Sequence, residues 1–231
     1  MPKESQGRAA VVDQLSSGEI PNTVAWVEIP SDYVVSGNPA TREVELGRVG
    51  RTSFGLWEQS PGRAAGRGPA EAFVVLSGSC HLHVNGAEPI LLAQGSICQT
   101  ASDAYTDWDV TRTLRKLYLV LDDGAPASNA FSYPAFRATD GGGTEDHGLV
   151  GELGGTMFGT CDLRTMDPLP SAATTILLIA AGACRIHVAD ERPVHISEGC
   201  VVRISGTSAG AVSADGGTGF FITEMVGPGP P

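Results

Sequence analysis

The residues with the clearest potential for chemistry are two histidines at positions i and i+2, His81 and His83. This spacing places both imidazole rings on one face of a β-strand, where together they could ligate a metal ion. The opposite face of the same stretch carries Cys80, Leu82 and Val84, and an apolar face is expected to point into a core. We therefore expect both histidines to lie on the outer face, with a metal site as the open alternative.

The cysteines suggest neither a zinc site nor a disulfide framework. Their number is odd and no Cys-x-x-Cys pair occurs among them: Cys80, Cys98, Cys161, Cys184 and Cys200. We expect Cys80 and Cys184 to be buried, reduced and inert thiols. The glycines at positions 141–143 lack the lysine and hydroxyl residue of a phosphate-binding loop, so we interpret this stretch as a plain loop.

The elements that must position any functional group are short strands. Between Thr52 and Tyr118, apolar runs of four to six residues alternate with glycine, proline or the pair Asn85-Gly86. This pattern is typical of strands joined by tight turns, and no segment of ten or more residues shows helical periodicity. Two further strands are predicted ahead of this stretch, at Thr23–Ile29 and Arg42–Leu46.

The window Gly78–Gly95 recurs at Gly182–Gly199, at an offset of 104 residues. Six positions are identical in the two windows: Gly78/Gly182, Cys80/Cys184, His83/His187, Val84/Val188, Pro89/Pro193 and Gly95/Gly199. A repeat of this length indicates the duplication of a whole domain rather than a solenoid. We expect domains at residues 21–122 and 149–226, a disordered or extended N-terminus at 1–20, a linker at 123–148 and a tail at 227–231.

Composition restricts the kinds of partner. The net charge of −11 over 231 residues disfavours nucleic acid and anionic membrane surfaces. No uncharged apolar run approaches the roughly 20 residues that a membrane span needs, and residues 1–19 lack the apolar core of a signal peptide. We expect a soluble, cytoplasmic protein that binds a small molecule and neither nucleic acid nor membrane, with a homodimer as an open alternative.

Four elements of the first repeat stand in a recognisable order. They are Gly-Leu-Trp-Glu-Gln-Ser-Pro-Gly at positions 55–62, Glu71 followed by Gly78, Trp-Asp-Val at positions 108–110, and Arg115-Lys116. With them the chain resembles the cupin family. Combined with the duplication, the resemblance implies an all-β fold of two tandem jelly-roll barrels, a bicupin. It implies little about function, because cupins perform many activities on one barrel.

The resemblance also implies a metal site whose ligands are missing here. Cupins typically bind a metal through a His-x-His sequence shortly before the motif glutamate and through a later histidine. The glutamate is present as Glu71, but the histidine positions fall within residues 64–67 and on Thr106, none of which is histidine. Because a divalent metal needs about three or four protein ligands, we expect neither barrel to hold a metal, and we expect no cofactor.

If the first barrel follows its family, Trp57, Glu71 and Trp108 line or rim its cavity, and Tyr118 joins them. Two indoles provide flat apolar walls for a cyclic or conjugated ligand. A carboxylate between them is partly desolvated, which makes Glu71 the candidate general acid or base. The alternative is that both tryptophans are core packing and that Glu71 is a satisfied structural carboxylate.

A cation next to this carboxylate is expected from Lys116 or Arg115, either to bind an anionic group of the ligand or to pair with Glu71. The positions in the second repeat that correspond to Trp57, Glu71 and Trp108 are smaller and uncharged, namely Cys161, Thr175 and Val212. We therefore expect chemistry in the first barrel and not in the second.

These observations favour a metal-independent bicupin that acts on a small, cyclic or unsaturated organic molecule by acid–base chemistry, as an isomerase, cyclase, dehydratase or lyase. The alternative is a non-catalytic bicupin that binds or senses a small molecule. A metal-dependent dioxygenase is a distant third hypothesis.

Overall fold

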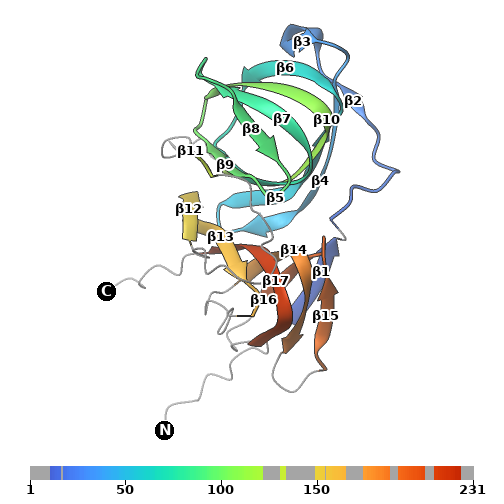
Figure 1. Cartoon of the computed structure of the whole chain (residues 1–231), viewed down its shortest axis with the longest axis vertical. Coiled ribbons are helices and arrows are strands. Elements are labelled where there is room, and N and C mark those ends of the chain that lie inside the picture. Colours follow the sequence, from blue (N-terminus) through green and yellow to red (C-terminus); the bar gives the residue numbers. More distant parts are fainter. Residues whose placement is uncertain are drawn as a thin grey trace. The chain divides into compact units, whose positions relative to one another are not determined.

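A computed structural model describes residues 11–16, 18–121, 131–133, 149–153, 155–164, 174–187, 192–205 and 211–224. Within these ranges the chain consists of β-strands and one short 3-10 turn, η1 (Ser31–Tyr33). The predicted all-β class is therefore confirmed. The strands divide into two compact units, one formed by residues 18–137 and the other by residues 1–17 and 138–231 (Figure 1).

The unit of residues 18–137 contains one curled antiparallel sheet. Its strands are β2 (Val27–Glu28), β3 (Val34–Ser36), β4 (Ala40–Val49), β5 (Thr52–Gln59), β6 (Gly62–Arg67), β7 (Glu71–Val84), β8 (Ile90–Ala93), β9 (Ile97–Thr100), β10 (Tyr105–Leu121) and β11 (Phe131–Tyr133). The main path runs β11-β9-β7-β10-β5-β4-β2, while β8 pairs with β7 and β6 pairs with β10 and β3. Arg42–Leu46 lies within β4, but the strand predicted at Thr23–Ile29 is reduced to β2.

Strands β7 and β10 hold the curled sheet together, because they pair with each other and each also belongs to two further ladders. The first half of β7 pairs with β9 and its second half with β8, while β10 pairs with β6 and then with β5. Midway along β7, Gly78 adopts a φ of +84°, and a side chain there would collide with the carbonyl oxygen of Thr113. Only glycine tolerates both conditions, so Gly78 is required for the bend.

The second unit repeats this order of strands. It contains β1 (Val11–Ser16), β12 (Leu149–Leu153), β13 (Thr156–Asp162), β14 (Thr174–His187), β15 (Val194–Ser197), β16 (Val201–Ser205) and β17 (Ala211–Glu224). The path β16-β14-β17-β13-β12 has the same order as β9-β7-β10-β5-β4, and β15 pairs with β14 as β8 pairs with β7. Gly182 in β14 has the same φ of +84° as Gly78.

Two segments expected to lie outside the domains contain paired strands. The N-terminal segment 1–20, expected to be disordered or extended, includes β1, which pairs antiparallel with β16. The segment 123–148, expected to be a linker, includes β11, which pairs with β9. In each unit an additional strand from a distant part of the sequence thus completes the same edge. The tail at 227–231 lies outside the described residues.

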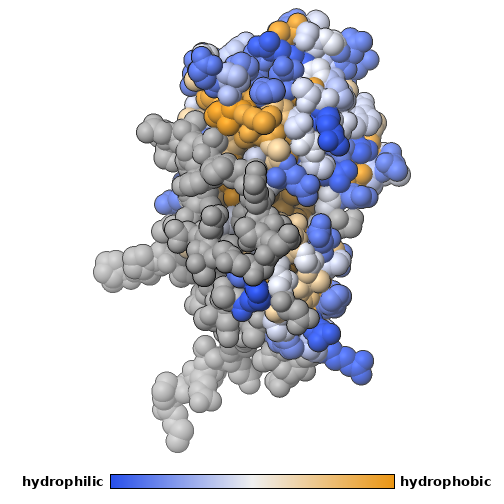
Figure 2. Space-filling model, viewed as in Figure 1, coloured by the Kyte–Doolittle hydropathy of each residue, from blue (hydrophilic) through white to orange (hydrophobic). Residues whose placement is uncertain are grey.

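The cores lie on the faces that the alternating patterns predict. On β7, Cys80 and Leu82 are buried, whereas His81 is exposed and His83 partly exposed, so the expected outer face of the two histidines is confirmed. All five cysteines are buried and free, as expected for Cys80 and Cys184. The coloured surface in Figure 2 is mostly hydrophilic, with one hydrophobic cluster over β8, whose Leu91 is 63% exposed. No helix in the described ranges is long and apolar enough to cross a membrane.

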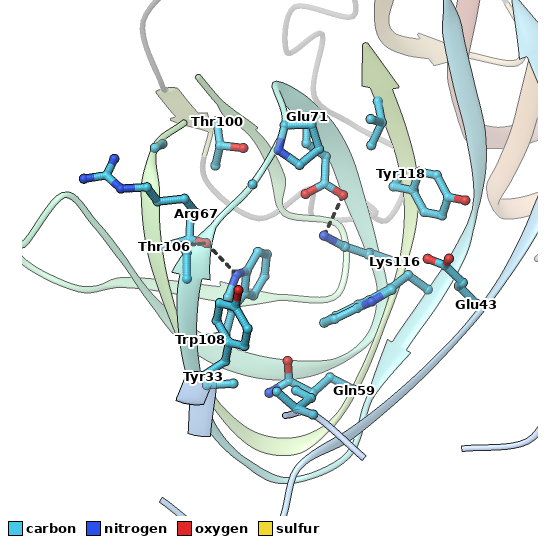
Figure 3. Close-up of a pocket in the computed structure, with 18 of the residues that line it drawn as sticks. Tyr33, Glu43, Gln59, Arg67, Glu71, Thr100, Thr106, Trp108, Lys116 and Tyr118 are labelled. Carbon is cyan, nitrogen blue, oxygen red and sulfur yellow. Dashed lines mark hydrogen bonds and ion pairs between the residues drawn. The ribbon is translucent and has the colours of Figure 1, made fainter. Parts of the chain in front are cut away.

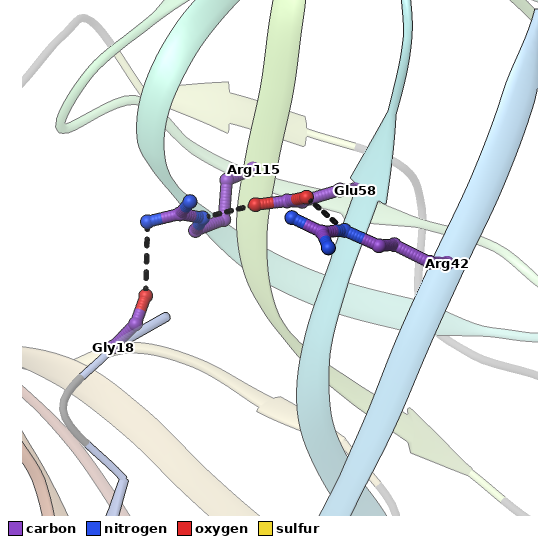
Figure 4. A network of polar contacts seen from close by, with 4 residues as sticks. All are labelled: Gly18, Arg42, Glu58 and Arg115. Carbon is purple, nitrogen blue, oxygen red and sulfur yellow. Dashed lines mark hydrogen bonds and ion pairs between the residues drawn. The ribbon is translucent and has the colours of Figure 1, made fainter. Parts of the chain in front are cut away.

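On one face of β5, Glu58 is buried between two arginines, with only 1% of the residue exposed. Its Oε2 accepts a hydrogen bond from Nε of Arg42 at 2.6 Å, and its Oε1 accepts one from Nε of Arg115 at 2.5 Å. Arg115 also donates to the carbonyl oxygen of Gly18 at 3.3 Å (Figure 4). Because these partners come from β4, β5, β10 and the segment that enters the unit, one carboxylate fastens four parts of the chain.

Replacing Glu58 by alanine is expected to lower the free energy of unfolding of this unit by about 2–3 kcal/mol, because two partly buried guanidinium groups lose their common partner. All three tryptophans, Trp26, Trp57 and Trp108, lie in this unit, so denaturant unfolding followed by tryptophan fluorescence reports on it alone. The exposed Glu88→Gln variant is the control. A loss no larger than that of the control would contradict the structural role of Glu58.

The buried thiols are expected to resist modification in the native protein. Burial raises the pKa of Cys80, Cys98 and Cys161 to about 12 and that of Cys184 to about 11. Since the thiolate is the reactive form, an aromatic disulfide reagent at neutral pH should label these four thiols only after denaturation. Peptide mass spectrometry identifies the labelled residues, and rapid labelling of any of the four in the folded protein would show that its site opens.

Candidate functional site

A cavity of about 560 Å³ opens in the unit of residues 18–137, and the five residues predicted to form the site, Trp57, Glu71, Trp108, Lys116 and Tyr118, all line it (Figure 3). Arg115, the other cation considered for the site, does not line the cavity and pairs with Glu58 instead. The structure therefore brings together side chains that lie up to 61 residues apart in the chain.

Strand alternation explains which side chains point inward. On β5, Trp57 and Gln59 face the cavity, while Glu58 between them faces the arginines. On β10, Lys116 and Tyr118 face the cavity, and Lys116 lies directly opposite Trp57 in the ladder with β5. Successive side chains of a strand point to opposite faces, so the cavity and the Glu58 network occupy the two sides of the same strands.

The centre of the site is an ion pair between Lys116 and Glu71. Nζ of Lys116 lies 2.6 Å from Oε1 of Glu71, and the two side chains are 5% and 15% exposed. The ammonium group also lies 4.6 Å from the ring centroid of Trp57 and 4.5 Å from those of Phe73 and Trp108. The carboxylate and the negative ring faces together compensate the ammonium for its lost hydration.

The aromatic rings form a connected wall. The centroids of Trp57 and Trp108 are 5.9 Å apart at an interplanar angle of 50°, and those of Phe73 and Trp108 are 5.4 Å apart at 45°. Nε1 of Trp108 donates to Oγ1 of Thr106 at 3.2 Å, which fixes the orientation of the indole. Tilted packing of this kind exposes flat apolar surface to the cavity and is favourable beyond the burial itself.

Several lining residues were not predicted from the sequence. Glu43 and Glu45 of β4 lie two residues apart, and this spacing alone indicates that they share a face of the strand. Gln59 could have been found in the same way from Trp57. Tyr33 of η1 gave no local signal, because its ring reaches the cavity by lying against Gly66, where a side chain would meet it.

The residues of the cavity do not fit a metal ion of the kind that cupin barrels bind. Its lining contains neither histidine nor cysteine, and the carboxylate of Glu71 is paired with Lys116. The histidine pair of β7 lies on the outer face, where His81 is exposed. Across the described ranges, no three side chains of His, Cys, Asp or Glu gather closely enough to hold a metal.

In the second unit, the equivalent places are filled by uncharged residues. The ladder between β13 and β17 sets Cys161 opposite Gly219, where the first unit has Trp57 opposite Lys116. A side chain at Gly219 would press on Cys161, Leu163 and Leu177. Thr175, in the place of Glu71, is buried and shares a hydrogen bond with Thr223 at 3.2 Å. Neither charge of the central ion pair has a counterpart there.

Among the residues that line the cavity, Tyr118 has a clearly shifted pKa. Burial raises its pKa from 10.0 to about 12, and the nearby carboxylates of Glu43, Glu45 and Glu71 act in the same direction. Its hydroxyl lies over Gly55, where any side chain would collide with it. At neutral pH the phenol is therefore a neutral hydrogen-bonding group at the cavity wall.

Several solved structures have a fold similar to that of this chain. A Pseudomonas aeruginosa protein described as glyoxylate-induced aligns with a TM-score of 0.63 and 13% identity, covering 100% of this chain and 96% of its own. A cupin 2 conserved barrel domain protein from Leptotrichia buccalis gives 0.61 and 10%, with coverages of 87% and 100%. Salicylate 1,2-dioxygenase from Pseudoaminobacter salicylatoxidans gives 0.58 and 10%, with coverages of 97% and 83%. At such identities the likeness shows the fold alone, which is that of the cupins.

The match to a sequence family covers a shorter part of the chain than these structural alignments do. Residues 46–118 match the family described as the EutQ-like cupin domain, so this part of the chain is a cupin domain of that type. The expected resemblance to cupins is confirmed at this level. No curated protein matches the sequence significantly.

The phenol of Tyr118 is expected to ionise near pH 12 in the folded protein. Because the folded state holds this proton more tightly than the unfolded chain, the stability that Tyr118 contributes is complete below pH 10 and is lost as pH rises toward about 12. The ultraviolet difference titration between the wild type and Tyr118→Phe isolates this group, while tryptophan fluorescence verifies that the unit stays folded. Ionisation near pH 10 with the fold intact would contradict the burial of this hydroxyl.

Proposed function

We propose that the barrel of residues 18–137 binds a small organic molecule with a cyclic or unsaturated part and transforms it by acid–base chemistry. An isomerase, cyclase, dehydratase or lyase is the kind of enzyme that such a site would serve. The observation that carries the proposal is the Glu71–Lys116 pair, 2.6 Å apart, placed in a cavity between two indoles. A general base needs a carboxylate that reaches the substrate from a fixed position, and Lys116 holds Glu71 in place.

In this proposal Glu71 accepts a proton from the bound molecule and returns it at another atom or to a leaving group. One oxygen of Glu71 pairs with Lys116, and the side chain retains 15% exposure toward the cavity. Trp57 and Trp108 hold the planar part of the molecule, and the hydroxyl of Tyr118 serves as a neutral hydrogen-bonding group. The ammonium of Lys116 stabilises negative charge that develops beside Glu71 during proton transfer.

We further propose that the chain is a bicupin and that the chemistry does not require a metal. The repeated strand order and the shared glycine conformations support two barrels. Metal independence is supported by the chemistry of the cavity, whose lining offers no histidine. The second barrel, with Cys161, Thr175 and Gly219 at the corresponding places, would then be structural.

A second candidate function is binding without catalysis. The ion pair is compatible with this function, because the charge of Glu71 is already compensated by Lys116. Its burial therefore does not by itself require a catalytic role. In this case the two tryptophans recognise a ligand, and Glu71 fixes Lys116 among the rings.

Comparing the wild type with Glu71→Gln distinguishes the two functions. Each chain is treated with a chelator, desalted and incubated with a mixture of cellular metabolites, and mass spectrometry follows every compound over time. We expect the wild type to consume at least one compound and Glu71→Gln to do so about a hundredfold more slowly or less. The glutamine keeps the shape of the side chain but leaves the largely buried ammonium of Lys116 without its counter-charge, so we expect a lower Tm than that of the wild type, and turnover is compared at a temperature where both chains are folded.

The exposed Glu88→Gln variant serves as the control and should match the wild type. Retention of a compound by the wild type without any turnover would favour the binding function over catalysis. Turnover that disappears on chelation and returns with a divalent metal would overturn the metal-independent mechanism. Equal turnover by Glu71→Gln and the wild type would remove Glu71 from the chemistry.

A further inference from the structure

We infer that the ligand of this cavity is a cation, an organic ammonium or related amine carried on an apolar or aromatic body. The inference rests on the proposed function, since it names the class of molecule that the same site receives. Two observations support it: the lining of the cavity has an excess of carboxylates, and the site already holds the ammonium group of Lys116.

The charge balance of the lining is negative. Among the described residues, the cavity is lined by the carboxylates of Glu43, Glu45 and Glu71 and by the cations Lys116 and Arg67. Lys116 is neutralised by Glu71. The guanidinium of Arg67 is 60% exposed and is engaged by Asp103, through its carbonyl oxygen at 2.5 Å and its Oδ2 at 3.4 Å. The two exposed carboxylates of β4, Glu43 and Glu45, therefore have no partner among the cations of the described lining.

Glu43 and Glu45 are weakly compensated from elsewhere. Glu45 pairs with Arg48 at 4.0 Å, and because both side chains are more than half exposed, the pair contributes little. No ion pair of Glu43 occurs in the described part of the chain, and Figure 3 shows its carboxylate beside Tyr118 at the side of the cavity. The negative field of both groups reaches into the cavity, where it disfavours ionisation of Tyr118.

The surroundings of Lys116 show which kind of group this site stabilises. There, an ammonium group sits against one carboxylate and three ring faces, at 2.6 Å from Glu71 and 4.5–4.6 Å from the ring centroids. Elsewhere in the lining, the carboxylates of Glu43 and Glu45 lie near the ring of Tyr118, whose pKa they raise. Both cations of the described lining are already paired, Lys116 with Glu71 and Arg67 with Asp103. A second ammonium group, brought by the ligand, fits beside Glu43 and Glu45.

The strand register builds these two positions side by side. Across β4, β5 and β10, Glu43 stands opposite Trp57, and Trp57 stands opposite Lys116. In the next row, Glu45 stands opposite Gly55, and Gly55 stands opposite Tyr118. Because Gly55 has no side chain, the ring of Tyr118 crosses this place toward β4. A cationic group can therefore contact the carboxylates while its apolar body lies against the indoles.

Three probes of similar size and different charge test the inference: benzylammonium, benzyl alcohol and benzoate. Isothermal titration calorimetry of the full chain, together with tryptophan fluorescence, measures the Kd of each. We expect benzylammonium to bind about tenfold more tightly than benzyl alcohol, benzoate to bind more weakly than either, and added salt to weaken benzylammonium binding alone. The double variant Glu43→Gln/Glu45→Gln should raise the Kd of benzylammonium about three- to tenfold and leave that of benzyl alcohol unchanged.

The double variant Glu19→Gln/Glu88→Gln is the matched control, because it removes the same charge from exposed positions outside the lining and should leave all three Kd values unchanged. Binding of benzyl alcohol or benzoate as tight as that of benzylammonium would overturn the inference and leave the ligand site of the proposed function standing. An unchanged Kd in the Glu43→Gln/Glu45→Gln variant would also overturn it. Failure of all three probes to bind would overturn both the inference and the proposed ligand site.

Discussion

The unit of residues 18–137 depends on a charge pair that is held inside it. Lys116 and Glu71 are both largely buried, and each would be costly to remove from water alone. Their contact, together with the faces of Trp57, Phe73 and Trp108, offsets that cost. The cavity therefore has a paired polar centre next to an aromatic wall. A small-molecule site with a few placed polar groups in an aromatic pocket has this form.

The same strands carry a second charge network on their other face, where Glu58 joins Arg42 and Arg115. The two networks are one residue apart along β5 and β10, yet they have different consequences. The Glu58 network fastens the sheet and does not line this cavity, whereas the Glu71 network borders it. Because successive side chains of a strand point to opposite faces, the two networks remain separate. Strands β5 and β10 can therefore carry a structural network on one face and a candidate active site on the other.

The two units share a strand order but differ in their interiors. Strand order and the glycine at the bend of the long strand are kept in both units. The interior differs, because the second unit has Thr175 and Gly219 in place of the ion pair, and Leu163 and Leu177 press on the space that a longer side chain would need. An uncharged interior packs with aliphatic side chains, so the second unit retains the architecture without the polar centre.

The sequence by itself determined the all-β class, the resemblance to cupins and the buried face of Cys80 and Leu82, because alternation and turn residues are local signals. It also grouped Trp57, Glu71, Trp108 and Tyr118 through the resemblance. Only the tertiary structure decided that Lys116, and not the adjacent Arg115, meets Glu71, since both are cations and a shift of one residue in the register of β10 would exchange their faces. It likewise decided that Glu43 and Glu45 reach the cavity, because their position depends on the pairing of β4 with β5. It also decided that β1 of the N-terminal segment and β11 of the expected linker pair with the sheets, because pairing between separate segments leaves no local pattern.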